Sequence, residues 1–248
     1  MVPTRPAWIA LQFLTRLPLQ LKTTPDPEQK AQSLLWYPLV GAFIGAALMG
    51  LAILMQNWPP PVAAALLLLF WVVATGGLHL DGLADSADAW AGGLGNPERS
   101  LSIMQDPAAG PIGVVSLVLV LLLKFAALQA ALSNHDIALL WLAPVFGRAA
   151  ILGLFLSTPY VRRRGLGADM AQHGSSLKLM LVLGLTLTVG LIVGQLIAGM
   201  TALLGLLIFL WIRAQSIRRL GGFTGDVAGS VIEVVEAVVL LLLVIFSI

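Results

Sequence analysis

The sequence contains no cysteine and very little charge. Of its 248 residues, 10% are Asp, Glu, Lys or Arg and 58% are hydrophobic, whereas an ordinary globular domain carries about 25% charged residues. The absence of cysteine excludes disulfides, thiolate zinc sites and thiol nucleophiles. The scarcity of charge excludes a water-facing surface of normal extent, so the outer surface must face lipid. A net charge of +2 is also too small to indicate a nucleic-acid partner.

The chain also lacks a polar region long enough to form a separate soluble domain. We therefore expect one integral membrane domain over residues 1–248, folded as an all-α polytopic bundle of transmembrane helices. Each span needs about 20 apolar residues. About seven stretches qualify, or six if the fifth and sixth, nearly fused at Gly199, count as one. The predicted spans cover residues 34–55, 62–80, 111–133, 137–159, 177–198, 200–212 and 230–248.

The basic residues gather on one side of this predicted topology. Residues 1–33 form an N-terminal segment too interrupted to span, and we expect it to lie in the membrane interface. The loops near 81–110, 160–178 and 213–229 are predicted on the same side of the membrane as this segment. This side carries all 14 basic residues except Lys124 and Arg148. The positive-inside rule predicts that this side, with the N-terminus and the active site, faces the cytoplasm from the inner membrane. All 12 acidic residues except Asp136 lie on this side or at its edge.

Three aspartates are spaced to share one face of a helix at the end of the second predicted span. In residues 79–88 (HLDGLADSAD), Asp81, Asp85 and Asp88 stand at i, i+4 and i+7. Carboxylates this close repel one another unless a cation or a basic partner compensates them, and Mg²⁺, Mn²⁺ or Ca²⁺ suits such oxygen ligands. We expect a metal site, with a solvated helix end as the alternative. His79 is expected to be a hydrogen-bonding helix-end residue.

A second acidic group runs from a glycine-rich turn into the last predicted span. In residues 221–236 (GGFTGDVAGSVIEVVE), Asp226, Ser230 and Glu233 share a helical stripe, with Glu236 about 60° round from Glu233. Apolar residues follow, so Glu233 and Glu236 should face the protein interior or a water-filled cavity rather than lipid. Glycines allow backbone N–H groups to approach an oxyanion closely, which favours a phosphorylated substrate near the arginines at 162–164 and 218–219. Topology alone would also place arginines there.

Lys124 and Arg148 lie inside predicted spans. A charge near mid-bilayer costs at least about 2.5–3.5 kcal/mol, so each should have a partner. They either line a polar cavity and contact phosphate, or form salt bridges with Glu233 or Glu236, and both alternatives stay open. Arg148 would be the better phosphate ligand because its guanidinium can bind in two places.

Several motifs together resemble one known family over nearly the whole chain. They are residues 13–18 (FLTRLP), 37–41 (YPLVG), 76–85 (GGLHLDGLAD), 103–106 (IMQD), 165–167 (GLG) and 222–226 (GFTGD). The HLDGLAD run and the GFTGD turn are the specific motifs. With them the sequence resembles the cobalamin synthase family, adenosylcobinamide-GDP ribazoletransferase. The family usually reads Met-Arg-Asp-Ser-Arg where this chain reads MQDPAAG at 104–110. A basic contact there is lost or is supplied by another residue, such as Arg99.

The resemblance implies a Mg²⁺-dependent displacement at a diphosphate, with Mn²⁺ as an alternative cation. The 3′-hydroxyl of α-ribazole, or of its 5′-phosphate, would attack the cobinamide-linked phosphorus of adenosylcobinamide-GDP, and GMP would leave. Such chemistry needs a cation, basic phosphate contacts and a carboxylate that takes a proton. We assign Asp81, Asp85, Asp88 and Asp226 to metal, Asp81, Glu233 and Glu236 to catalysis, and Arg148, Lys124, Arg99, Asp106, Thr224 and Gly225 to substrate binding.

Two other functions compete with this interpretation. A CDP-alcohol phosphotransferase would read Asp-Gly-x-x-Ala-Arg, but residues 81–85 read DGLAD with no arginine following. A cation- or proton-coupled transporter would place its acids near the membrane midplane and often shows an inverted repeat, whereas these acids cluster at one face. The expected partners are the two substrates and the lipid bilayer. Association with other corrinoid-pathway enzymes or with a second copy stays open.

Overall fold

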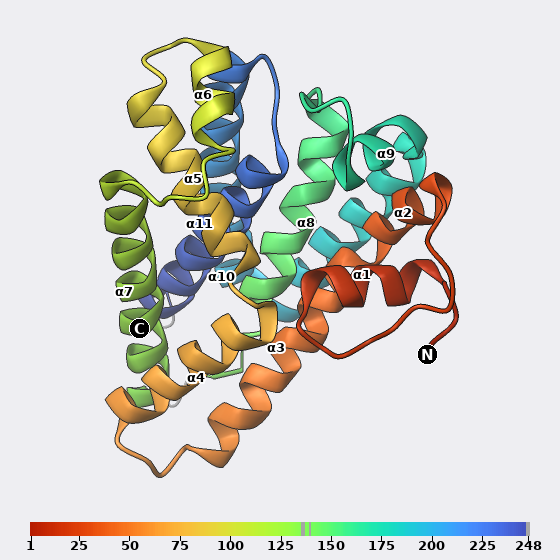
Figure 1. The fold of residues 1–248 in the computed structure, drawn as a ribbon. Coiled ribbons are helices and arrows are strands. Elements are labelled where there is room, and N and C mark those ends of the chain that lie inside the picture. Colours follow the sequence, from red (N-terminus) through yellow and green to blue (C-terminus); the bar gives the residue numbers. More distant parts are fainter. Residues whose placement is uncertain (135–136, 139, 247–248) are drawn as a thin grey trace.

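The chain folds as a bundle of helices, drawn in Figure 1 from a computed structural model that describes residues 1–134, 137–138 and 140–246. Asp136, the one acid predicted on the far side, lies outside the described residues. Within these ranges β pairing is limited to two isolated bridges, and helices make up the rest of the regular structure. The predicted all-α class is confirmed. The helices are α1 (Pro6–Leu14), α2 (Pro27–Ser33), α3 (Tyr37–Leu54), α4 (Pro60–Thr75), α5 (Leu78–Gly92), α6 (Pro97–Ile103), α7 (Pro111–Ser133), α8 (Leu142–Ser157), α9 (Leu166–His173), α10 (Ser176–Leu220) and α11 (Gly225–Phe246).

Among the described residues, 4 helical segments are long and apolar enough to cross a membrane, or up to 5 if the bent pair α4 and α5 is one span. The α7 helix has the bounds of the third predicted span. Two features reduce the predicted seven spans to five: α8 has only 16 residues, and the fifth and sixth predicted spans run together in α10. The bend between α4 and α5 accounts for the difference between five and 4. The break in α10 falls at Gln195, whose φ is 48° and ψ −134°, rather than at Gly199. The count of seven and the cytoplasmic N-terminus stay predictions.

A sharp bend separates α4 from α5. Gly76 and Gly77 both have φ of 69°, a left-handed conformation that glycine adopts at little cost and other residues resist. The two helices consequently meet at 88°, and the second predicted span does not run straight to residue 80. The bend starts α5 as a separate helix, which carries all three clustered aspartates.

The α5 and α11 helices cross where each presents a glycine. A Cβ atom added at Gly82 would lie 2.7 Å from the backbone oxygen of Asp226, and one added at Gly229 would lie 3.1 Å from the backbone oxygen of His79. Only hydrogen fits at these positions, so the two backbones approach closely. This crossing brings the aspartates of α5 beside Asp226.

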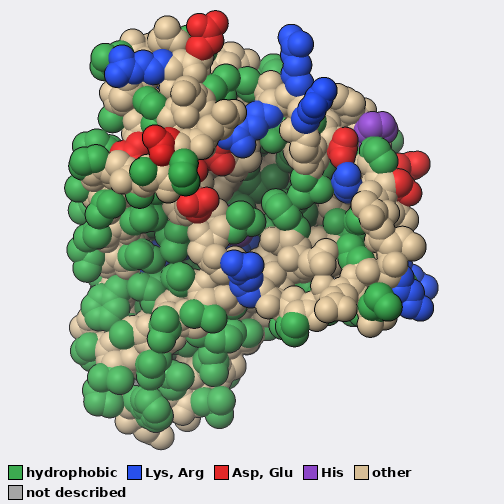
Figure 2. Space-filling model, viewed as in Figure 1, with side chains coloured by type: hydrophobic (Ala, Val, Ile, Leu, Met, Phe, Trp, Pro, Cys, Tyr) green, Lys and Arg blue, Asp and Glu red, His purple; other side chains and the backbone are tan. Residues whose placement is uncertain are grey.

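On one face of the molecule (Figure 2), the exposed charged side chains and the apolar surface occupy different halves. Figure 2 shows acidic and basic side chains gathered around a hollow in the upper half, above a hydrophobic lower half. Large apolar side chains are exposed along the outer helices, among them Phe43 of α3, Leu69 of α4, Leu122 of α7 and Ile192 of α10. A belt of this kind is what a bilayer would cover.

Candidate active site

Three cavities meet at the carboxylate of Asp81. The N-terminal cavity, about 720 Å³, lies between α1, α2 and the bend before α5. The central cavity, about 280 Å³, lies between α5, α8, α9 and α11, and the loop cavity, about 420 Å³, lies between α5 and residues 104–109. Asp81 lines all three and is exposed. Among the described residues its side chain has no hydrogen bond or ion pair, so it is free to act on a bound molecule.

The central cavity holds Asp226 in a fixed position. One carboxylate oxygen, Oδ2, accepts a hydrogen bond from Arg162 Nη2 at 2.6 Å and another from Thr224 Oγ1 at 3.3 Å. Thr224 is fully buried and its hydroxyl also accepts a hydrogen bond from Val227 N at 3.3 Å, in the first turn of α11. The Thr224 hydroxyl therefore helps to position the carboxylate of Asp226. Gly225 lines the cavity itself.

Aromatic packing and backbone hydrogen bonds fix the segment that carries Arg162. The rings of Tyr160 and Phe223 pack edge to face with centroids 5.2 Å apart. Val161 N donates to Phe223 O at 2.9 Å, and Phe223 N donates to Pro159 O at 2.9 Å. Burial raises the pKa of Tyr160, so its phenol stays protonated at neutral pH and can donate a hydrogen bond to a ligand.

His79 also lines the central cavity, and its position differs from the sequence expectation. The side chain is 4% exposed, and neither ring nitrogen has a hydrogen-bond partner among the described residues. The bend at Gly76 and Gly77 places His79 in the first turn of α5, against Gly229 of α11, rather than at the end of a continuing span. An unpartnered buried imidazole is costly, which marks it as a site residue that sequence reasoning missed.

The two other aspartates of α5 differ from each other. The oxygens of Asp88 accept hydrogen bonds from Gly110 N at 2.7 Å and Gly113 N at 2.9 Å, at the start of α7. A helix N-terminus favours an anion, so Asp88 has its compensation without a metal. Asp85 has no such partner among the described residues, lies within electrostatic range of Asp81 and Asp226, and lines the loop cavity.

The structure brings Asp106 to the site but not Arg99. Asp106 lines the loop cavity, where its Oδ1 accepts a hydrogen bond from Ala108 N at 2.9 Å. Arg99 lies in the first turn of α6 and lines none of the three cavities. The α6 helix packs on α5 through Ser100, whose Oγ donates to Ala89 O at 3.4 Å, near the far end of α5.

Lys124, Arg148, Glu233 and Glu236 form a buried ion network away from the cavities. Lys124 Nζ lies 2.6 Å from Glu233 Oε2 and 2.5 Å from Glu236 Oε2, and Arg148 pairs with Glu236. None of the four is more than 4% exposed, which confirms that the two glutamates face the interior. Lys124 and Arg148 thus form the salt bridges that were one of their two expected roles, rather than lining a substrate cavity. The network joins α7, α8 and α11.

The free carboxylates suit a divalent cation held together with a substrate. Among the described residues, no three His, Asp or Glu side chains are arranged to hold a metal on their own. Mg²⁺, however, usually keeps several waters and binds through one or two carboxylates plus substrate phosphates. Asp81 and Asp85, both without protein partners in the described ranges, supply oxygen donors of that kind.

Fold and site together define a polytopic membrane enzyme. The family model described as Cobalamin-5-phosphate synthase matches residues 6–244, and the chain belongs to this family. It is 52% identical over 245 residues to the adenosylcobinamide-GDP ribazoletransferase of Pseudomonas syringae pv. syringae (strain B728a), covering 96% of this chain and 98% of that protein. The protein of the same name from Pseudomonas aeruginosa PAO1 is 50% identical over 236 residues, with 95% and 96% covered. No solved structure matches.

Proposed function

We propose that this protein is an adenosylcobinamide-GDP ribazoletransferase of the inner membrane. It would join adenosylcobinamide-GDP to α-ribazole, or to α-ribazole 5′-phosphate, and release GMP. Relatives about half identical over nearly their full length carry this name. The observation that carries the proposal is the free carboxylate of Asp81 at the junction of three cavities, because a reaction between two substrates needs one group that both can reach.

The transfer is a displacement at phosphorus. The bond from the acceptor 3′-oxygen to the cobinamide-linked phosphorus forms, the bond to the oxygen that bridges the two phosphorus atoms breaks, and that oxygen leaves with GMP. The acceptor hydroxyl must lose its proton as it attacks. We assign this proton to a carboxylate oxygen of Asp81, because Glu233 and Glu236 are buried and paired with Lys124 and Arg148.

Phosphate binding falls to the arginines of the central cavity. Arg162 and Arg164 both line it, and guanidinium groups bind phosphate oxygens in two places at once. Asp85 would hold Mg²⁺ or Mn²⁺ together with the substrate phosphates, with Asp81 beside it in the loop cavity and Asp226 within electrostatic range. Bound there, the cation would neutralise the diphosphate and stabilise the leaving oxygen. Tyr160 and His79 would contact the substrate from the wall of the same cavity.

The orientation of the protein follows from its charge. With the basic residues on the cytoplasmic side, the cavities would open to the compartment that supplies nucleotide-activated substrates. The apolar lower half would lie in the bilayer. Association with other corrinoid-pathway enzymes, or with a second copy, stays a prediction.

The test is an assay of GMP release in proteoliposomes that contain Mg²⁺. GMP should appear from adenosylcobinamide-GDP only when α-ribazole or its 5′-phosphate is present, together with the joined corrinoid product in equal amount. Chelation of the cation should stop both. Correctly inserted protein that releases no GMP with either acceptor, or that releases GMP equally well without an acceptor, would contradict the proposal.

A further inference from the structure

The segment that follows α1 is built into the wall of the N-terminal cavity. Arg16 N donates a hydrogen bond to Ala74 O at 2.7 Å, at the end of α4. One residue earlier, the Thr15 hydroxyl donates to Leu11 O at 2.6 Å and closes the last turn of α1. The backbone of this segment is therefore tied on both sides, and Arg16 has a fixed starting point.

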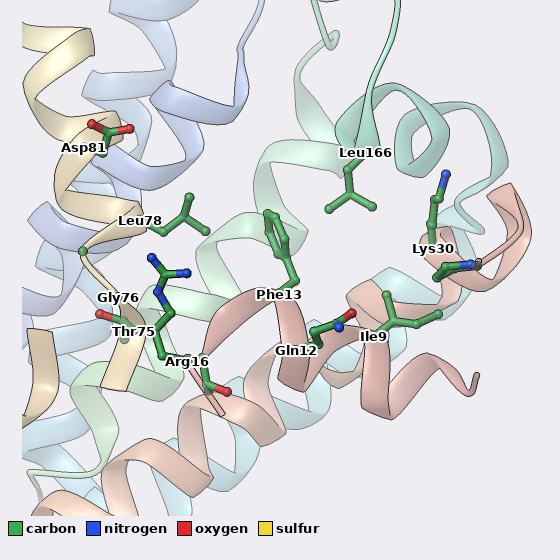
Figure 3. A pocket seen from close by; sticks show the side chains of 13 residues that line it. Ile9, Gln12, Phe13, Arg16, Lys30, Thr75, Gly76, Leu78, Asp81 and Leu166 are labelled. Atoms are coloured by element: carbon green, nitrogen blue, oxygen red, sulfur yellow. The ribbon is translucent and has the colours of Figure 1, made fainter. Parts of the chain in front are cut away.

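The side chain of Arg16 lies across Gly76 in the bend between α4 and α5. A Cβ atom added at Gly76 would lie 2.6 Å from Cδ of Arg16, so the arginine stem needs a glycine beneath it. Figure 3 shows the guanidinium extending from this point into the cavity, toward the side where Leu78 and Asp81 lie. Apart from this contact the residue is exposed, so its guanidinium is accessible to a ligand in the cavity.

The guanidinium of Arg16 carries an uncompensated charge. Within the described residues it has no hydrogen bond or ion pair, although Asp81 lines the same cavity. The other cation of the cavity wall, Lys30, is paired with Asp169 at 2.7 Å. The cavity thus offers one free guanidinium and one free carboxylate that do not bond to each other, which is an arrangement suited to a ligand between them.

We propose that Arg16 binds a phosphate group of a substrate in the N-terminal cavity. The inference rests on the proposed function and deepens it. Arginine favours phosphate because its planar fork matches two phosphate oxygens. The N-terminal and central cavities share Phe13, Leu78, Asp81 and Leu166 in their walls, so a molecule held by Arg16 reaches the reacting groups. The phosphate belongs either to the diphosphate of adenosylcobinamide-GDP or to the 5′-phosphate of the acceptor.

Arg5 provides a matched control for this proposal. It lies on the same N-terminal segment, is exposed, precedes α1 and lines none of the three cavities. A basic residue that serves only membrane topology should behave like Arg5. We therefore compare Arg16→Gln with Arg5→Gln, since both changes remove one positive charge and keep a polar side chain.

The experiment measures KM and kcat for GMP release in proteoliposomes, with α-ribazole and with α-ribazole 5′-phosphate as acceptors. Loss of a charge-assisted hydrogen bond should raise one KM by about tenfold to a hundredfold in Arg16→Gln, with a much smaller change in kcat. If the KM of adenosylcobinamide-GDP rises by the same factor whichever of the two acceptors is used, Arg16 binds the diphosphate. If only the KM of the phosphorylated acceptor rises, Arg16 binds the 5′-phosphate. Arg5→Gln should change each KM by no more than about twofold.

Arg16→Lys separates a binding role from a folding role. It keeps the charge and most of the stem that packs over Gly76, but loses the fork, so its KM should lie between those of the wild type and Arg16→Gln. The inference about Arg16, but not the proposed function, would be overturned if Arg16→Gln had the same KM values as Arg5→Gln. A lower kcat and thermal stability at unchanged KM would overturn it in the same way. A wild-type protein that releases no GMP would overturn the proposed function as well.

Discussion

The molecule contains two groups of acidic residues in opposite environments, one buried and paired with basic residues, the other lining the cavities. Glu233 and Glu236 lie in the apolar interior, where Lys124 and Arg148 neutralise them. The aspartates around the three cavities lie on the polar half, and Asp81 is exposed without a partner among the described residues. Asp226 and Glu233 lie about two turns apart on the same helix, α11, so a single helix carries members of both groups.

The two groups differ in how the removal of one charge should affect the stability of the fold. A buried ion pair contributes little net stability, but removal of one member leaves an unpaired charge in a medium that solvates it poorly. An exposed carboxylate can be neutralised with little effect on folding, so a loss of turnover after its neutralisation would report on chemistry rather than on stability. The buried group should therefore control stability, and the exposed group should control turnover.

The largest effect is expected for Asp81→Asn. Turnover should fall by about a hundredfold to ten-thousandfold, because the amide cannot accept the hydroxyl proton, whereas thermal stability should stay close to that of the wild type. GMP release and unfolding in detergent measure the two. Glu98→Gln, on exposed α6, is the matched control and should leave both unchanged. An active Asp81→Asn enzyme would remove Asp81 from the proposed role.

Glu236→Ala should act in the opposite way. It leaves Arg148 without its partner and weakens the hold on Lys124, so the free energy of unfolding should drop by about 3–5 kcal/mol. Denaturation in detergent measures this loss. The double variant Arg148→Met with Glu236→Leu removes both charges and should recover most of the stability. A double variant as unstable as the single one would show that the pairing is not the cause.

Gly82→Ala tests the contact that brings Asp226 beside the aspartates of α5. The added methyl would lie 2.7 Å from the backbone oxygen of Asp226, so α5 and α11 must separate, at a cost of about 1–3 kcal/mol. Activity should fall with stability, since Asp226 moves away from Asp81. Gly184→Ala, where no neighbour lies within 4 Å, is the control and should keep full activity.

The smallest effect is expected for Asp88→Asn. Its carboxylate caps α7 through Gly110 and Gly113, so replacement should lower the stability by about 1 kcal/mol and leave turnover nearly intact. Kinetics and unfolding in the same detergent check both. If Asp88→Asn instead abolished turnover at unchanged stability, Asp88 would join Asp81 as a site residue, as its spacing in the sequence suggests.

The sequence predicts the features that depend on composition and helical period. Scarce charge predicts a lipid-facing bundle, and the apolar run at 111–133 predicts α7 with its bounds. The spacing of Asp81, Asp85 and Asp88 places them on one helix, and the cost of buried charge predicts partners for Lys124 and Arg148. These inferences need only local geometry and a general preference for neutralised charge.

Features that depend on backbone torsion or on distant segments are not visible in the sequence. Hydropathy does not reveal that Gly76 and Gly77 adopt positive φ, so the 88° bend and the separate start of α5 are missed. The same holds for the break at Gln195. The placement of Arg16 over the bend depends on contact between segments far apart in the chain, and helical spacing alone could not show that Asp88 caps α7.

The buried network also constrains the order in which the helices can settle into the membrane. Lys124 is synthesised 109 residues before Glu233, which at about 5–20 residues per second leaves it without that carboxylate for some seconds or longer. During this interval α7 carries a lone ammonium into or beside the lipid. The network is therefore complete only after α11 has been synthesised, and a chain that stops before α11 leaves Lys124 without either glutamate.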